Sequence, residues 1–337
     1  MEHFTKKSFA TSRSLTYIYY DSFPHKPLPT DATTPVLYLL HGFPDTARLF
    51  HAVLPYLSPL ASRILIPDQL GHGATARPPS PSSYNSRALA ADHAELLAHA
   101  GVAGNVVAIG HDWGAFSAQR LWFFHPALLR GVAFLNVAPT PPVRQPFDLD
   151  AANAAAEEAT GHARGAYWEL FVADDGAAVV DAHLDAFWRA MHGEGAHWMR
   201  DVFCVRGALR QFLEQEGEVQ LREYARPGRG WREEWLHGVR SGGGIGGALC
   251  WYRAMTEGHT YAVEKELPEE SVQITVPTLF LGCERDDVSL PAAIDGCRKT
   301  GMLPDLTVVN INAMHWSLME KPEEVGRALY EWVKDKF

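Results

Sequence analysis

The sequence has few cysteines and no strongly basic tract. Four cysteines occur among its 337 residues, and no two of them form a close pair or a C-x-x-C motif: Cys204, Cys250, Cys283 and Cys297. This usage argues against a disulfide framework or a cysteine-rich zinc site and is typical of a reducing compartment. The net charge is −10. Without a run of lysine or arginine, a chain of this charge gives no support to nucleic-acid binding.

Targeting and membrane-spanning segments are also missing from the pattern. Residues 1–14 lack the long apolar core of a secretory signal. No apolar run approaches the ~20 residues that span a bilayer. We therefore expect a cytoplasmic protein without a membrane span. No histidine spacing fits a zinc motif such as H-E-x-x-H, so we expect no metal ligands.

Short apolar runs alternate with helix-like segments along much of the chain. Strands are predicted at 15–20, 36–40, 63–67, 106–109, 132–137, 276–282 and 306–312, and helices at 85–100, 115–124 and 322–337. This alternation indicates an α/β fold with a mostly parallel, doubly wound sheet. The Pro-rich stretch that ends at Pro35 is predicted to be a loop.

A long helical segment interrupts the strand pattern. Between about Pro139 and Leu267, patches rich in alanine, tryptophan and arginine are broken by glycine and proline clusters. We therefore predict an α/β core in two portions, residues 1–140 and 268–337. Residues 141–267 are predicted to form an inserted helical cap, or lid, domain.

The segment from Val106 to Gly114 carries the strongest chemical signal. An apolar run ends at Gly110-His111-Asp112-Trp113-Gly114, and a helix-like run follows. This is the pattern of a nucleophile elbow, with Asp112 where serine normally stands. A carboxylate that attacks a saturated carbon leaves an ester, which an activated water can hydrolyse. Asp112 therefore indicates attack on an epoxide or an alkyl halide, and the alternative is an ordinary turn with a surface aspartate.

Two later strands end at residues that could complete such a site. The strand around Thr278–Leu281 runs into a segment with two adjacent carboxylates, Asp286 and Asp287. The next strand runs toward His315. Nucleophile, acid and histidine thus follow three strands in the order expected of an elbow enzyme. The residues alone leave both aspartates open as the acid.

With these residues in view, the chain resembles the epoxide hydrolases of the α/β-hydrolase fold, the soluble type with a helical cap. The resemblance implies that Asp112 is the nucleophile, that His315 activates water and that Asp286 orients His315. The backbone N–H groups of Phe43 and Trp113 would form the oxyanion hole. The motifs that carry it are His41-Gly42-Phe43-Pro44, Gly110-His111-Asp112-Trp113-Gly114, Trp251-Tyr252-Arg253, Glu284-Arg285-Asp286 and His315-Trp316.

The resemblance also implies a cis Phe43–Pro44 bond and two cap tyrosines that donate hydrogen bonds to the epoxide oxygen. Tyr252 matches the second tyrosine of the family, and Tyr167 is our choice for the first. The alternative for Tyr167 is an aromatic residue of a helix core. The predicted substrate-binding residues are Phe43, Trp113, Trp168 and Trp316.

The predicted partner is a small-molecule epoxide, apolar and of an aryl or fatty-acid type, which the enzyme would convert to a vicinal diol without a cofactor. We expect a monomer or a homodimer. The runner-up is a haloalkane-type dehalogenase with the same Asp-His-Asp set, in which Trp113 and Trp168 would donate to the halide. Tyr252 and Phe43 favour the epoxide. A third alternative is a catalytically silent receptor that uses the capped pocket.

Overall fold

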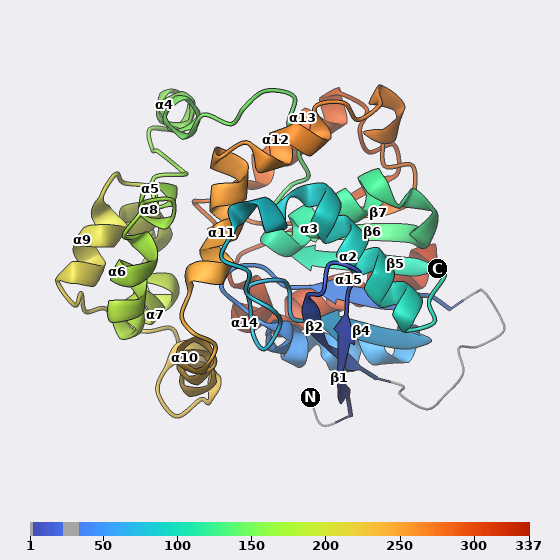
Figure 1. Cartoon of the computed structure of the whole chain (residues 1–337), viewed down its shortest axis with the longest axis horizontal. Coiled ribbons are helices and arrows are strands. Elements are labelled where there is room, and N and C mark those ends of the chain that lie inside the picture. The colour runs from blue at the N-terminus through green and yellow to red at the C-terminus, as the bar shows by residue number, and fades with distance from the viewer. Residues whose placement is uncertain (1–2, 23–33) are drawn as a thin grey trace.

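Residues 3–22 and 34–337 are described by the computed structural model, and they contain one eight-stranded sheet. The strands lie in the order β1-β2-β4-β3-β5-β6-β7-β8 (Figure 1). β2 pairs antiparallel with both β1 and β4, and all other neighbours are parallel. The predicted α/β fold with a mostly parallel sheet is confirmed. The strands are β1 Thr5–Ala10, β2 Thr16–Asp21, β3 Val36–Leu40, β4 Arg63–Pro67, β5 Val106–His111, β6 Leu129–Leu135, β7 Thr278–Cys283 and β8 Leu306–Ile311.

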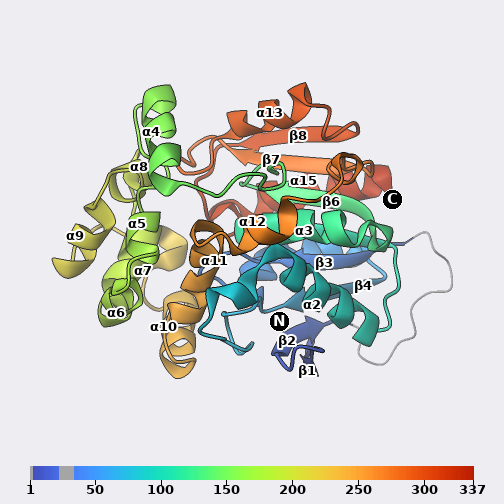
Figure 2. The ribbon, with the colours of Figure 1, turned by 45° about the horizontal axis from the view of Figure 1, so that its top comes forward.

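The central strands are largely apolar because helices cover both faces of the sheet. Every residue of β3, β4, β5 and β7 is buried, as expected for parallel strands between two helical layers. Helices α2 and α3 pack together on one face, and α1 and α15 pack together on the other (Figure 2). The helices around the sheet are α1 Leu54–Leu57, α2 Ser86–His99, α3 Trp113–Phe124, α13 Ile294–Lys299, α14 Ser317–Glu320 and α15 Pro322–Lys336.

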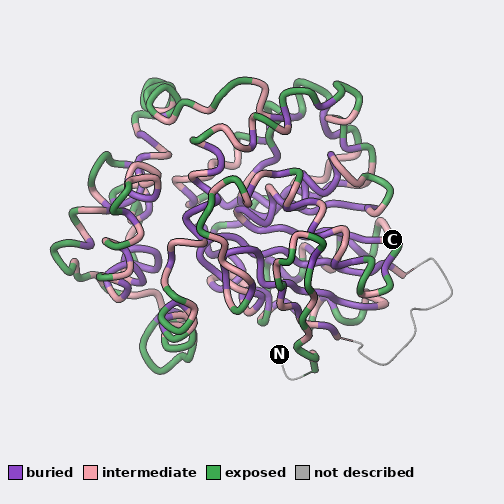
Figure 3. Tube along the Cα trace, in the orientation of Figure 1, coloured by how far each residue is buried: buried purple, intermediate pink, exposed green. Residues whose placement is uncertain are grey.

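Between β6 and β7 the described chain forms helices and no strand. Residues 136–277, called the insert from this point, lie largely at the left of Figure 1, beside the sheet. Purple, buried positions continue from the sheet into the inner side of the insert, and its outer turns are green and exposed (Figure 3). Its helices are α4 Leu149–Thr160, α5 Trp168–Phe171, α6 Gly176–Ala182, α7 Leu184–His192, α8 Trp198–Phe203, α9 Ala208–Glu214, α10 Trp231–Ser241, α11 Gly246–Thr256 and α12 His259–Glu264.

Short 3-10 turns link several of these elements. They are η1 Ala47–Val53, η2 Ser58–Leu60, η3 Pro81–Tyr84, η4 Pro126–Leu128, η5 Glu223–Ala225, η6 Glu269–Ser271 and η7 Pro291–Ala293. A buried ion pair ties the insert to the core, since Arg120 of α3 meets Glu264 of α12 with N–O distances of 2.9 and 3.0 Å.

Each strand and helix that the sequence predicts is present, with small shifts at its ends. β1 was not predicted because Thr5–Ala10 is largely polar, as befits an edge strand that is held by pairing with β2. β6 ends one residue before Asn136, which turns the chain with a φ of 65°. Residues 23–33 of the predicted loop lie outside the described residues. The cap boundaries at 141 and 267 stay predictions.

Candidate active site

Asp112 lies at a sharp turn between β5 and α3. Its backbone has φ 55° and ψ −124°, a left-handed conformation that a non-glycine residue adopts only under constraint. The two flanking glycines are required by close packing. A Cβ on Gly110 would lie 2.1 Å from the carbonyl oxygen of Gly114, and a Cβ on Gly114 would lie 1.9 Å from that of Leu40. The chain therefore turns tightly enough to present the Asp112 carboxylate at the carboxyl edge of the sheet.

Backbone donors surround the Asp112 carboxylate. The N–H of Phe43 donates to Oδ1 over 2.7 Å, and the N–H of Trp113 contributes a second hydrogen bond. Trp113 is the first residue of α3, so the helix N-terminus also faces the carboxylate. The Phe43–Pro44 peptide bond is cis, in agreement with the sequence resemblance. Both predicted oxyanion donors thus reach the predicted nucleophile.

His315 lies between two carboxylates. Its Nδ1 is 2.8 Å from Oδ2 of Asp286, and its Nε2 is 3.6 Å from Oδ2 of Asp112. Burial lowers the pKa of His315, but the two carboxylates outweigh this effect and raise it to about 10. Burial raises the pKa of Asp112, and the hydrogen bond and charge of His315 reverse that shift, so that it falls below its usual value. These shifts favour a charged imidazole of His315 between two ionised carboxylates at neutral pH.

Of the two adjacent aspartates, Asp286 is the one that meets the histidine. Its Oδ1 accepts the backbone N–H groups of Val288 and Ser289 over 3.1 and 3.0 Å. Asn136 donates to Oδ2 over 2.9 Å. The neighbouring Asp287 carries a buried carboxylate oxygen without a partner among the described residues. The geometry thus identifies Asp286 as the carboxylate that pairs with His315, a choice that the residues alone left open.

The two predicted tyrosines come from different parts of the insert and meet near Asp112. Tyr167 directly precedes α5, Tyr252 lies on α11, and their ring centroids are 6.0 Å apart. Burial and the Asp112 charge raise the pKa of both phenols well above the usual value, and side-chain hydrogen bonds with Trp168 and Trp113 partly oppose the rise. Both phenols therefore stay protonated in the physiological range and can donate a hydrogen bond.

A cavity of about 480 Å³ opens at Asp112. Trp113, Tyr167 and Trp168 line it, together with residues of α4 and the 288–293 segment. Phe43 and Trp316, which the sequence also assigned to substrate binding, do not line this cavity within the described part of the chain. The Phe43 ring packs against Tyr252 at 5.1 Å, and the Trp316 indole donates to Asp45 over 3.1 Å. Their binding role stays a prediction.

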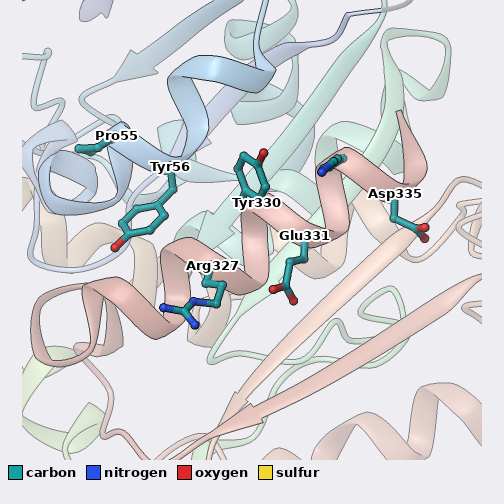
Figure 4. Close-up of a pocket in the computed structure, with 7 residues that line it drawn as sticks. Pro55, Tyr56, Arg327, Tyr330, Glu331 and Asp335 are labelled. Carbon is teal, nitrogen blue, oxygen red and sulfur yellow. The ribbon is translucent and has the colours of Figure 1, made fainter.

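Larger hollows elsewhere lack comparable chemistry. An open groove of about 680 Å³ lies between α1 and α15, where Tyr56 faces Arg327, Tyr330 and Glu331 (Figure 4). The described residues that line it include no histidine, cysteine or serine. Volume alone does not define a site. Among the described residues, Asp112 and Tyr167 line the Asp112 cavity, whereas His315 and Tyr252 lie next to Asp112 and Trp113 without lining it.

Two polar residues that support the site were not assigned roles from the sequence. Asn136 holds Asp286 and also accepts the hydroxyl of Ser317 over 2.7 Å. His111 donates from Nε2 to the carbonyl oxygen of His315 over 2.7 Å. The sequence signal that could have identified them is a polar residue directly at the end of a buried strand, because that position lies at the carboxyl edge of the sheet.

The fold and this edge geometry define an α/β hydrolase. The family described as alpha/beta hydrolase fold matches residues 35–322, and the chain belongs to it. Within that family, the chain is 29% identical to an epoxide hydrolase of Neurospora crassa, over 96% of this chain and 93% of the relative. It is 28% identical to epoxide hydrolase A of Mycobacterium tuberculosis, over 89% and 90%. Family membership together with these relatives makes the chain a hydrolase.

Solved structures show the same fold. Epoxide hydrolase A from Mycobacterium thermoresistibile superposes with a TM-score of 0.75 at 23% identity, over 98% of both chains. Potato (Solanum tuberosum) epoxide hydrolase I gives 0.74 at 22% identity, over 98% of this chain and 99% of its own. Among residues 3–22 and 34–337, no helix is both long and apolar enough to cross a membrane.

Proposed function

We propose that this protein is an epoxide hydrolase that converts an epoxide and water to a vicinal diol through a covalent ester on Asp112. One observation carries the proposal. The elbow carboxylate lies beside a His315–Asp286 pair and close to two protonated tyrosines, the partly buried Tyr167 and the buried Tyr252. A carboxylate nucleophile with phenol donors suits the opening of a strained ether. The names of the relatives agree with it.

The first step would be attack of an Asp112 oxygen on an epoxide carbon. The C–O bond of the ring breaks, and the oxygen that leaves takes a proton from Tyr167 or Tyr252. Formation of the ester removes the negative charge of Asp112, which is one cause of the raised pKa of His315. The pKa of His315 then falls, and its proton can restore the phenol. The histidine is thereby converted to a base when a base is needed.

The second step would be hydrolysis of the ester. His315 takes a proton from water, and the hydroxide attacks the carbonyl carbon of the Asp112 ester. The N–H groups of Phe43 and Trp113, which bond the carboxylate, would bind the oxyanion. Collapse releases the diol, whose second oxygen takes the proton from His315. The remaining carboxylic proton returns to His315, and Asp112 is a carboxylate again.

The surroundings of the indoles favour an epoxide over an alkyl halide. Halide departure needs N–H donors that are free to bind an anion. Beside the indoles of Trp113 and Trp168 lie the rings of Tyr252 and Tyr167, at centroid distances of 5.2 and 6.3 Å. Their phenol O–H groups can protonate an epoxide oxygen, which a departing halide does not need. The aromatic lining favours an apolar epoxide, of an aryl or fatty-acid type.

The test is turnover of styrene oxide and a 1-haloalkane by the purified protein, with Tyr252→Phe beside the wild type. We expect diol from styrene oxide, no halide release and a loss of diol formation in the variant. Halide release that is indifferent to Tyr252→Phe would favour the dehalogenase alternative. Turnover of neither substrate class would support the silent receptor.

The helical segment between residues 141 and 267 would act as the cap of this enzyme, because it supplies both tyrosines and about half of the residues that line the cavity. A cytoplasmic location and a monomeric or homodimeric state stay predictions.

A further inference from the structure

The outer wall of the Asp112 cavity is formed by α4, and one of its polar groups has an unused donor. Leu149, Ala152, Asn153 and Ala156 line the cavity from this helix. Asn153 is 1% exposed, and its Oδ1 accepts the backbone N–H of Gly165 over 2.9 Å. This bond fixes the orientation of the amide. The Nδ2 group is buried and has no acceptor among the described residues.

An arginine of the same cavity wall, Arg164, also forms no ion pair with any residue that the structure describes. Arg164 lines the same cavity, and its buried Nε has no partner within the described chain. The nearby Arg206 is different, since it pairs with Glu169, Asp150 and Glu157 on the outer surface. A guanidinium Nε–H and an amide NH₂ that are buried without acceptors carry a desolvation cost.

The rest of the lining has the opposite character. Of the described lining residues, only Asp112 is acidic, and the other cation, Arg120, is neutralised by Glu264. Aromatic side chains, including Phe147 and Trp168, lie along the wall. Helix α4 lies well apart from the start of α3 in both views of the ribbon (Figures 1 and 2). The cavity thus combines a nucleophile, an apolar wall and a positively charged region on its α4 side.

We propose that Arg164 and Asn153 form a subsite for a carboxylate, so that the substrate is an epoxide joined through an apolar portion to an acidic group. The inference rests on the proposed function only in its naming of the epoxide. A guanidinium presents several N–H groups in a plane that matches a carboxylate, and the amide N–H can add a further bond. The bound carboxylate would supply the acceptors that both side chains lack.

The test separates binding from turnover. Binding of 4-phenylbutanoate and of 4-phenylbutan-1-ol to the full chain is measured by calorimetry, since the two compounds differ mainly in the charged end. We expect the acid to bind at least about tenfold more tightly than the alcohol, as a charge-assisted hydrogen bond supports. Arg164→Met should remove that preference. Arg327→Met, which removes an arginine of α15 outside the cavity, should keep it.

A second variant keeps the test decisive if Arg164→Met does not fold. Asn153→Asp retains an oxygen that can accept the Gly165 N–H and replaces the NH₂ donor with a negative oxygen. It should bind the acid at least about tenfold more weakly than the wild type does. Equal binding of acid and alcohol by the wild type would overturn the subsite. So would a preference that survives both variants or disappears in Arg327→Met.

Turnover then addresses the substrate class. The ratio of kcat/KM for 4-(oxiran-2-yl)benzoate to that for styrene oxide should exceed one in the wild type and fall about tenfold in Arg164→Met. An acid preference in binding with no diol from either epoxide would leave the subsite standing and remove the proposed reaction. If both epoxides gave diol and the kcat/KM ratio were the same in Arg164→Met as in the wild type, the proposed reaction would stand and the subsite would be overturned.

Discussion

The sheet edge and the insert supply different halves of the candidate site, and they hold their residues by different means. At the sheet edge, Asp112, Asp286 and His315 each follow a strand, and backbone N–H groups or buried polar side chains fix them. In the insert, Tyr167 and Tyr252 come from segments far apart in the sequence. Contacts between aromatic rings hold them, such as Tyr252 against Trp168 at 4.8 Å.

This difference leads us to expect that the sheet edge determines the reaction and that the insert determines its rate and its substrate. Residues at the ends of the strands have little positional freedom, because parallel strands bring their carboxyl ends to the same edge of the sheet. Aromatic packing accepts exchanges of similar size at modest cost. We therefore expect substitutions at the sheet edge to abolish a chemical step and substitutions in the insert to change its rate or its substrate.

The strongest test of the sheet edge is His315→Gln. Loss of the base should block ester hydrolysis and leave alkylation possible, so steady-state diol formation should fall at least about 10³-fold. Mass spectrometry after incubation with styrene oxide should find the mass of one substrate on the peptide that contains Asp112. Asp112→Asn is the matched control and should show no adduct. An adduct on another residue would contradict the two-step scheme.

The corresponding test in the insert is Tyr167→Phe. The change removes one of two proposed donors and keeps the ring, whose contacts include Phe171 at 5.3 Å. Alkylation in a single turnover should slow about 100-fold, as for the loss of one oxyanion donor. Tyr224→Phe is the control, because Tyr224 is another tyrosine of the insert and bonds to His192 instead. Equal effects of the two changes would make Tyr167 a packing residue.

The same contrast explains what could be predicted from the sequence. Buried strands, the elbow and the strand-end positions of Asp286 and His315 follow from local patterns, since glycine pairs and apolar runs record backbone constraints directly. The choice between Asp286 and Asp287 did not follow from the residues, because both lie on one loop. It depends on contacts with residues that are distant in the sequence, such as Asn136, which donates to Asp286 from a strand end 150 positions earlier in the chain.

The insert was less predictable for a physical reason. Its helices are short, and α5 spans only Trp168–Phe171. Their positions depend on contacts between distant aromatic residues, which no local spacing records. The unpaired donors of Asn153 and Arg164 could likewise not be predicted from the sequence, because the absence of a partner depends on the folded surroundings. Such positions need the structure before they can be interpreted.

The smallest expected effect is on the stability of the fold and comes from the charge that His315 carries beside Asp112 and Asp286. The pKa of His315 rises from an ordinary value of about 6.5 to about 10 in the folded protein. A raised pKa stabilises the fold fully below the unfolded value, and this contribution is lost as the pH rises through the folded value. The lowered pKa values of Asp112 and Asp286 act at the other end, and their contribution is lost in acid.

Melting temperatures of the wild type and His315→Gln, compared at pH 7 and pH 10.5, isolate this contribution. The wild type should lose at least about 2 °C of its advantage over the variant between the two values, because deprotonation of His315 ends its ion pairs with both carboxylates. Groups elsewhere titrate equally in both proteins and cancel. A constant advantage would mean that His315 is neutral in the folded protein at pH 7. The sheet edge would then hold its residues by hydrogen bonds alone, and loss of the Asp112 charge could not convert the histidine to a base.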